Sequence, residues 1–256
     1  MTTPPTIVRR NHGRGHSYYI DGHKVPGATT ILQAYPKPAL VGWAARAAAD
    51  EVVDFWDELV ELAPSERRER IRTAPDRDRD QAARRGTEVH RLVQQYLAGD
   101  DIAPPDELAG HFDAGVAFEK DWQVKELFVE APVAHPTLGY CGTIDLVADL
   151  ADGNRWLLDL KTSRSGIFRE VALQLAAYRY AQYYLDPSGE VKPMPHVDRC
   201  GAVWLRADRT YELLPIQADP DALKVFLHAK HVAEFANNKD DDRIGAALDP
   251  PNGKGP

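Results

Sequence analysis

The sequence predicts a mixed α/β protein in which helices flank a central mixed β-sheet. Apolar residues recur at helical spacing through much of residues 39–122, and strand-like segments begin at residue 125. Beyond that point strands and helices interleave. At 256 residues the chain is long enough to bury one substantial core. We therefore expect a single domain over 1–236, followed by a flexible tail over 237–256.

The first 80 residues are expected to add a hairpin and helices to a core that spans about 81–217. Residues 17–20 and 24–31 predict two strands around the Asp21-Gly22 turn pair. The segments that follow are, in order, a helix over 39–62, a short helix and exposed linker over the polar residues 64–80, a helix over 81–98 that ends at Gly99, and a helix over 106–122.

Strands dominate the second half of the chain. The pattern predicts three consecutive strands, a helix, a hairpin and a last helix, over 125–133, 139–150, 155–163, 168–185, 200–216 and 219–236. The turn signal Ala151-Asp152-Gly153-Asn154 joins the second strand to the third, which indicates that these two strands pair with each other.

Composition narrows the class of protein. The chain is 43% hydrophobic and 27% charged, as in ordinary globular proteins, and it has no apolar run of membrane-spanning or signal-peptide length. We expect a cytoplasmic protein, bacterial or phage-encoded, with no membrane partner. The net charge is −8, but residues 1–48 carry six basic residues against one acidic residue. DNA bound in one groove needs only such local positive charge.

Two cysteines, Cys141 and Cys200, are too few for the four thiolates of an iron–sulfur cluster. A disulfide is not expected in a reducing compartment. We therefore interpret both as small apolar residues and expect no iron–sulfur cluster.

Two consecutive predicted strands each carry an aspartate, Asp145 in TIDLVA and Asp159 in WLLDLK. If the strands pair antiparallel about the turn, the two carboxylates lie nearly opposite each other. Their neighbours are apolar, so the acids are expected to be half buried. Two such carboxylates repel strongly unless a cation lies between them, and oxygen ligands suit Mg²⁺ or Mn²⁺.

Three further residues lie close to these acids in the predicted arrangement. Lys161 shares a strand face with Asp159, and the carbonyl of Leu160 between them is a candidate metal ligand. His90, on the apolar side of the 81–98 helix, offers an imidazole ligand. Each residue alone also has an ordinary structural explanation, as a surface acid, an exposed strand end or a packed helix histidine.

Four motifs in order carry a family resemblance: R-x-G-T-x-x-H (84–90), G-x-I-D (142–145), D-x-K-T-S (159–163) and Q-x-x-x-Y (174–178). Together they resemble the RecB-like branch of the PD-(D/E)XK nucleases, which includes phage and mitochondrial exonucleases. The segment VPGATTIL (25–32), followed by Trp43, is similar to the lead-in of those two groups. The chain lacks the four-cysteine cluster of several relatives.

The resemblance implies a restriction-endonuclease-like core and a role for each matching residue. His90, Asp145, Asp159 and the Leu160 carbonyl would hold one or two Mg²⁺ or Mn²⁺ ions, and Lys161 would orient the attacking water or stabilise charge. Glu130 is an additional candidate as an outer-shell acid. Substrate contacts are expected from Gln174, Tyr178, Thr162, Ser163, Arg164, Arg84 and Arg85.

The expected function is a metal-dependent DNA exonuclease that acts on free or single-stranded ends in recombination, repair or phage DNA processing. A helicase or a recombinase is the expected protein partner. One alternative is a non-catalytic DNA-binding or assembly subunit with the same fold, and the intact set of His90, Asp145, Asp159 and Lys161 argues against it. The other is a structure-specific endonuclease, which the absence of a visible recognition domain disfavours.

Overall fold

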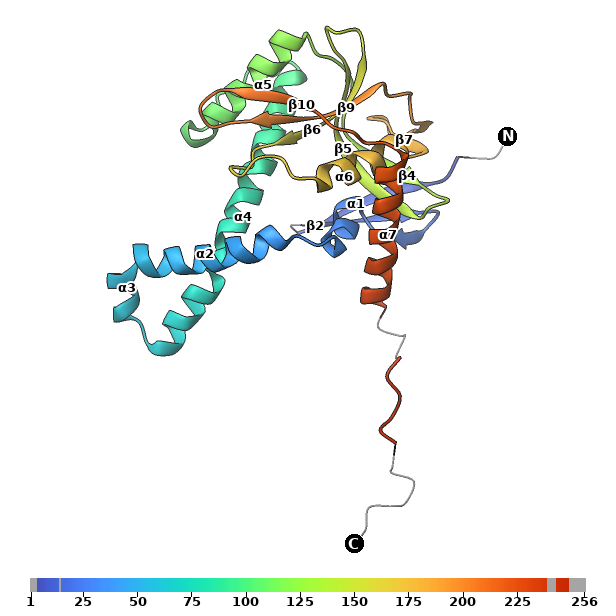
Figure 1. Ribbon diagram of the computed structural model, residues 1–256. Coiled ribbons are helices and arrows are strands. Elements are labelled where there is room, and N and C mark those ends of the chain that lie inside the picture. Colours follow the sequence, from blue (N-terminus) through green and yellow to red (C-terminus); the bar gives the residue numbers. More distant parts are fainter. Residues whose placement is uncertain (1–3, 14, 239–242, 249–256) are drawn as a thin grey trace.

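A seven-stranded mixed sheet forms the centre of the molecule in this computed structural model, which describes residues 4–13, 15–238 and 243–248 (Figure 1). The strand order is β10-β9-β6-β5-β4-β7-β8, and β6 pairs with β9 in parallel. The bounds are β4 Lys125–His135, β5 Tyr140–Asp149, β6 Arg155–Lys161, β7 Tyr183–Leu185, β8 Val191–Pro193, β9 Arg199–Leu205 and β10 Tyr211–Pro215. This arrangement confirms the predicted α/β fold with a mixed central sheet.

Helices cover both faces of the sheet. On one face, α5 (Asp106–Trp122) and the C-terminal half of α4 (Pro64–Leu97) pack on a core cluster that includes Leu158. On the other face, α6 (Glu170–Arg179) and α7 (Pro220–Asn237) pack on a cluster that includes Leu157. Successive residues of β6 enter opposite clusters because side chains alternate along a strand.

A separate three-stranded antiparallel sheet precedes these elements, with β1 Ile7–His12, β2 Gly15–Ile20 and β3 His23–Val25. The hairpin around Asp21-Gly22 is confirmed. The strand predicted over 24–31 is wrong beyond Val25, because α1 (Ala28–Ile31) and a 3₁₀ turn, η1 (Leu32–Ala34), follow. Cys141 N donates to Pro26 O at 3.1 Å, which ties this region to β5.

Helices α2 (Pro38–Asp54) and α3 (Trp56–Glu61), with the N-terminal half of α4, form an arm that projects from the core (Figure 1). The helix predicted over 39–62 breaks at Phe55. The linker predicted over 64–80 is wrong, because these residues belong to the continuous 34-residue α4. Its charged residues pair within the helix at i,i+3 spacing, as in Arg72–Glu69 and Arg79–Asp76.

The helix predicted over 168–185 also differs from the structure, since α6 ends at Arg179. The following residues form β7 and β8, which extend the sheet beyond β4. Pairing with the open edge of β4 outweighs the local helical pattern. At the C-terminus, residues 239–242 and 249–256 of the predicted flexible tail lie outside the described residues, and no described helix has the length and hydropathy needed to cross a membrane.

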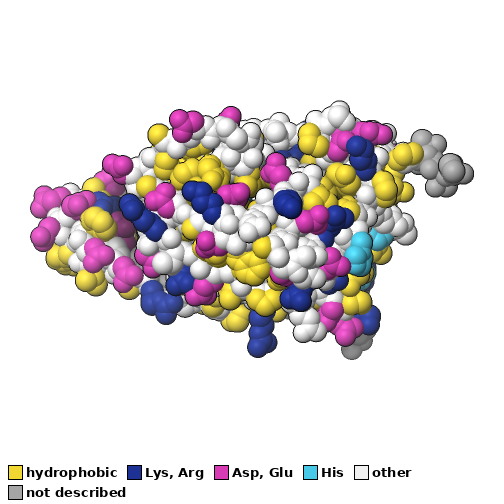
Figure 2. Space-filling view, turned by 90° about the horizontal axis from the view of Figure 1, so that it is seen from above, with side chains coloured by type: hydrophobic (Ala, Val, Ile, Leu, Met, Phe, Trp, Pro, Cys, Tyr) yellow, Lys and Arg dark blue, Asp and Glu magenta, His cyan; other side chains and the backbone are white. Residues whose placement is uncertain are grey.

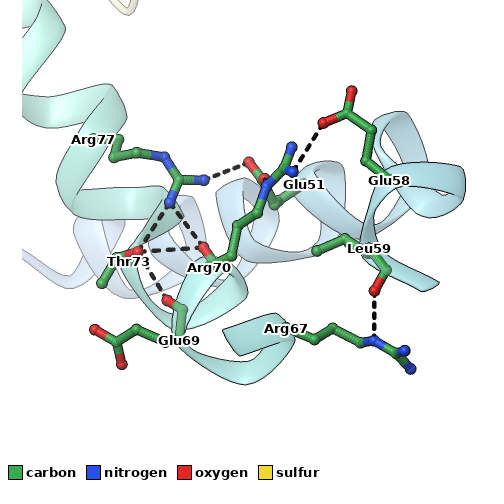
Figure 3. A network of polar contacts seen from close by, with 8 residues as sticks. All are labelled: Glu51, Glu58, Leu59, Arg67, Glu69, Arg70, Thr73 and Arg77. Carbon is green, nitrogen blue, oxygen red and sulfur yellow. Dashed lines mark hydrogen bonds and ion pairs between the residues drawn. The ribbon is translucent and has the colours of Figure 1, made fainter. Parts of the chain in front are cut away.

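The arm is held together by a polar network around Glu51 (Figure 3). The carboxylate of Glu51, with 10% of its side chain exposed, binds Arg70 and Arg77 at 2.7 Å each. The guanidinium of Arg67 donates to the carbonyl of Leu59 at 2.7 Å, which fastens α3 to the start of α4. Acidic and apolar side chains gather at the far end of the arm, where Phe55 and Trp56 are exposed (Figure 2).

We predict that Glu51→Gln loosens the arm without unfolding the core. The substitution removes the charge that both arginines share, and the arm buries few apolar side chains to compensate. Hydrogen exchange should accelerate in residues 38–78 and stay unchanged in β5 and β6. Glu69→Gln is the control, because its ion pair with Arg72 is exposed. Equal exchange rates in the Glu51 variant and the parent protein would contradict the assignment.

Candidate metal centre

Three acidic residues occupy adjacent positions on three neighbouring strands. The pairs Val129↔Leu146 and Ala131↔Ile144 flank Glu130 and Asp145 in the β4–β5 register. The pair Leu146↔Leu158 places Asp145 beside Asp159 one step further along β5 and β6. The β5–β6 pairing confirms the predicted antiparallel register, and the β4–β5 pairing extends the row to Glu130.

Glu130 adopts an unusual backbone conformation within β4. Its φ is +49°, in the left-handed region that residues other than glycine seldom adopt. Such strain persists only where the surrounding structure holds it, and it is frequent at functional sites. Here the flanking residues remain paired with β5, so the strain is confined to the residue whose carboxylate faces His90.

His90 reaches this row from α4. Its neighbours Val89, Leu92 and Val93 are buried in the core, which anchors the helix against the sheet. The Nδ1 atom of His90 lies 3.7 Å from Asp145 Oδ2 and 3.9 Å from Glu130 Oε1. One ligand atom from each of His90, Glu130 and Asp145 lies within 4.8 Å of the other two. We call these three residues the metal triad.

The Leu160 backbone orients two members of the triad. Its carbonyl accepts a hydrogen bond from His90 Nε2 at 2.8 Å, and its N–H donates to Asp145 Oδ2 at 2.8 Å. A histidine that binds a metal through one ring nitrogen commonly donates the other N–H to a carbonyl or carboxylate. In this structure the Leu160 carbonyl thus positions the imidazole, and its role as a further metal ligand stays a prediction.

Asp159 belongs to a second group beside the triad. Its carboxylate is 1% exposed, and Oδ2 lies 2.5 Å from Lys161 Nζ. The Oδ1 atom accepts a hydrogen bond from Gln174 Nε2 at 2.9 Å, and the same amide lies 3.5 Å from the Tyr178 hydroxyl. The structure thus brings the predicted Lys161, Gln174 and Tyr178 together around Asp159, beside the metal triad that Glu130 completes, and the role of Asp159 as a metal ligand stays a prediction.

The acidic surroundings control the protonation of His90. Burial lowers the pKa of His90, but the charge of Asp145 and a hydrogen bond to Glu130 more than offset this effect and raise the pKa to about 9. Lys161 is similar: burial lowers its pKa, while Asp159 and Asp145 raise it above its usual value overall. Both groups therefore carry positive charge at neutral pH, which partly balances three carboxylates.

The remaining predicted substrate contacts lie around the end of β6. Thr162 is buried against Gly86 of α4, where a Cβ would stand 3.4 Å from Thr162 Oγ1. The Ser163 carbonyl accepts a hydrogen bond from Trp204 Nε1 at 2.7 Å, so this loop is fixed to β9. Arg164 and Arg85 both lie close enough to His111 for their charges to lower its pKa, although burial is the larger cause.

Gly142 explains part of the G-x-I-D motif. A Cβ at this position would stand 2.3 Å from the Tyr178 ring, so only glycine permits this approach of α6 to β5. From the sequence, Glu130 was expected only as an outer-shell acid. For Glu130, the missing signal was the β4–β5 register, which no turn pair reveals because Pro136 interrupts the connection.

The metal triad fits a divalent cation that prefers oxygen and imidazole ligands. Two carboxylates and one imidazole converge from three elements, and a third carboxylate stands beside them. Lys161 compensates that third carboxylate, Asp159, through their ion pair, whereas the two carboxylates of the triad face the imidazole of His90. Concentrated negative charge of this kind is costly unless a cation compensates it.

Comparisons with known proteins add little to this geometry. No family model and no curated protein matches the chain. Among solved structures, the crystal structure of SSO0001 is similar at a TM-score of 0.30 and 12% identity, over 62% of this chain and 72% of that chain. A similarity of this size carries no argument about function, so the functional argument depends on the residues themselves.

We predict that Glu130→Gln weakens Mn²⁺ binding by about tenfold or more. Even outer-shell partners of a metal contribute about 10- to 100-fold to its affinity. Isothermal titration calorimetry on the metal-free protein measures the change. Glu126→Gln is the matched control, since Glu126 lies four residues earlier on the same strand and is exposed. Unchanged affinity in the Glu130 variant would exclude Glu130 from the centre.

A second prediction concerns pH and the metal-free protein. The folded-state pKa of His90, about 9, lies above the ordinary histidine pKa of 6.5. His90 therefore contributes stability that is fully present below pH 6.5 and is lost as the pH rises through 9. The melting temperature of the parent protein should approach that of His90→Gln across this window. A difference that stays constant with pH would contradict the proposed contacts with Asp145 and Glu130.

Proposed function

We propose that this protein is a divalent-metal-dependent deoxyribonuclease of the RecB-like PD-(D/E)XK type, and that it acts as an exonuclease on free or single-stranded DNA ends. The observation that carries the proposal is the convergence of the metal triad with the Asp159–Lys161 pair on the central sheet. A bound Mg²⁺ or Mn²⁺ ion would polarise a phosphoryl oxygen and supply a hydroxide nucleophile near neutral pH.

Lys161 supplies the complementary positive charge. Its pKa is held above the usual value, so the side chain acts as a cation rather than as a base. Its side chain is 29% exposed, so Lys161 lies at the surface of the site and is not sealed in the core. A fixed cation at the position where negative charge accumulates lowers the barrier to hydrolysis.

The residues around Lys161 keep its ammonium group in place. Asp159 holds Lys161 through their ion pair, and Gln174 holds Asp159 from α6. The Tyr178 ring packs over Gly142 and fixes α6 against the strand that carries Asp145. Around the site, the exposed Arg84 and Arg164 form no ion pair with a described residue and remain available to phosphates.

The direct test uses labelled linear duplex, circular duplex and single-stranded DNA with Mg²⁺ or Mn²⁺. The proposal predicts cleavage of linear and single-stranded DNA while circles stay intact. Cleavage of circles at comparable rate would favour a structure-specific endonuclease instead. Binding without cleavage under either metal would mean a non-catalytic DNA-binding subunit, the alternative that an intact site disfavours.

We predict that Lys161→Ala lowers the cleavage rate by about 100-fold or more, the usual effect of removing one charge-stabilising donor. Mn²⁺ binding should persist, because Lys161 is a cation and not a ligand. Lys125→Ala is the control, a lysine at the exposed start of β4. Parent-like cleavage by the Lys161 variant would remove Lys161 from the mechanism.

A further inference from the structure

A cleft of about 820 Å³ lies between the β1–β2 hairpin and α4. Its lining comes from two elements far apart in sequence: Arg9, Asn11, Gly13, Gly15 and His16 from the hairpin, and Asp80, Ala83, Arg84, Thr87 and Glu88 from α4. None of these residues belongs to the metal triad or to the group around Asp159. Apart from Arg84, the catalytic proposal assigns no role to the residues of this cleft.

Two arginines and two acids line this cleft, and they differ in their ion pairs. Asp80 is paired with Arg79 at 3.2 Å, and Glu88 is paired with Arg91, so each acid has a basic partner outside the lining. Arg9 and Arg84 form no ion pair with a described residue. The Nε atom of Arg9 is also buried without a hydrogen-bond partner among the described residues. Each wall of the cleft thus carries one arginine that has no ion-pair partner among the described residues.

The cleft leads to the metal triad along both walls. On α4, Thr87 is the i,i+3 neighbour of both Arg84 and His90, so the three residues form a connected row that winds along the helix. On the hairpin, Arg9 pairs with Tyr18 in the β1–β2 register, and the Tyr18 hydroxyl lies 2.7 Å from Thr143 Oγ1. Thr143 precedes Asp145 by two residues on β5, on the same strand face.

The dimensions select the ligand. The volume falls within the range of about 300–1,000 Å³ that holds one elongated small ligand. A few nucleotides of a single strand match this size, whereas the same volume cannot enclose both strands of a duplex. The lining offers cations and small polar side chains such as Asn11 and Thr87, and its imidazole ring, that of His16, already packs edge-on against Tyr18. The arginine contacts therefore go to the phosphate backbone.

We propose that this cleft binds single-stranded nucleic acid, with Arg9 and Arg84 contacting its phosphates, and delivers the strand to the metal triad. This inference rests on the proposed function in taking nucleic acid as the ligand. It goes further by assigning the hairpin, rather than the sheet, the selection of single strands.

The test measures anisotropy of a fluorescent oligothymidylate and of a matched duplex, without divalent metal, at several salt concentrations. The parent protein should bind the single strand more tightly. Each of Arg9→Gln and Arg84→Gln should weaken this binding and reduce the slope of log affinity against log salt by about 0.7, the value for one lost single-strand phosphate contact. In the double variant this slope should fall by about 1.4.

Matched controls keep the test specific. Arg10→Gln alters the next residue of β1, whose guanidinium stacks on Tyr19 at 4.6 Å, and Arg72→Gln alters an exposed arginine of the arm. Both should bind like the parent protein. Because Arg84 is exposed, its variant is expected to fold even if replacement of Arg9 disturbs the hairpin.

Three results would overturn the inference: no oligonucleotide binding by the parent protein, tighter binding of the duplex, or an unchanged salt slope in the Arg84 variant. Because no metal is present, these results are independent of cleavage. Arginine-dependent binding without cleavage under Mg²⁺ or Mn²⁺ would keep this inference and remove the proposed nuclease activity. Cleavage together with unchanged salt slopes in the arginine variants would keep the proposed nuclease activity and remove this inference.

Discussion

The structure depends on placing three carboxylates side by side across one sheet and compensating their charge. Glu130, Asp145 and Asp159 stand in register on β4, β5 and β6. Lys161 compensates Asp159 directly, while His90 faces the other two. This division explains why the pKa of His90 rises to about 9 despite burial. Protein groups alone leave the row with excess negative charge, and a divalent cation at the triad would remove the excess.

The rest of the fold holds the row of Glu130, Asp145 and Asp159 in position. Apolar clusters on both faces of the sheet fix β5 and β6, and the packing of Val89 and Leu92 brings α4 within reach. The hairpin lies against the same end of α4 and forms the cleft wall. The arm is different in kind, because ion pairs around Glu51 rather than a core hold it together.

Much of this architecture could be predicted from local pattern. The turn at 151–154 specified the β5–β6 pairing, and strand alternation placed Lys161 beside Asp159. Features that depend on distant contacts were missed. Pairing with the edge of β4 formed β7 and β8 where helical spacing favoured α6, and i,i+3 ion pairs kept residues 64–80 helical. Glu130 was expected only as an outer-shell acid, because its position beside Asp145 and His90 depends on the β4–β5 register and on a left-handed φ.

The most direct test of the account is a crystal structure of the protein with Mn²⁺, read from anomalous scattering. The account predicts a peak bounded by His90 Nδ1 and the carboxylates of Glu130 and Asp145, at ligand distances of roughly 2 Å. The His90 Nε2 hydrogen bond to Leu160 should persist in that structure. A triad without a peak at saturating Mn²⁺, or a peak confined to another part of the molecule, would contradict the central claim.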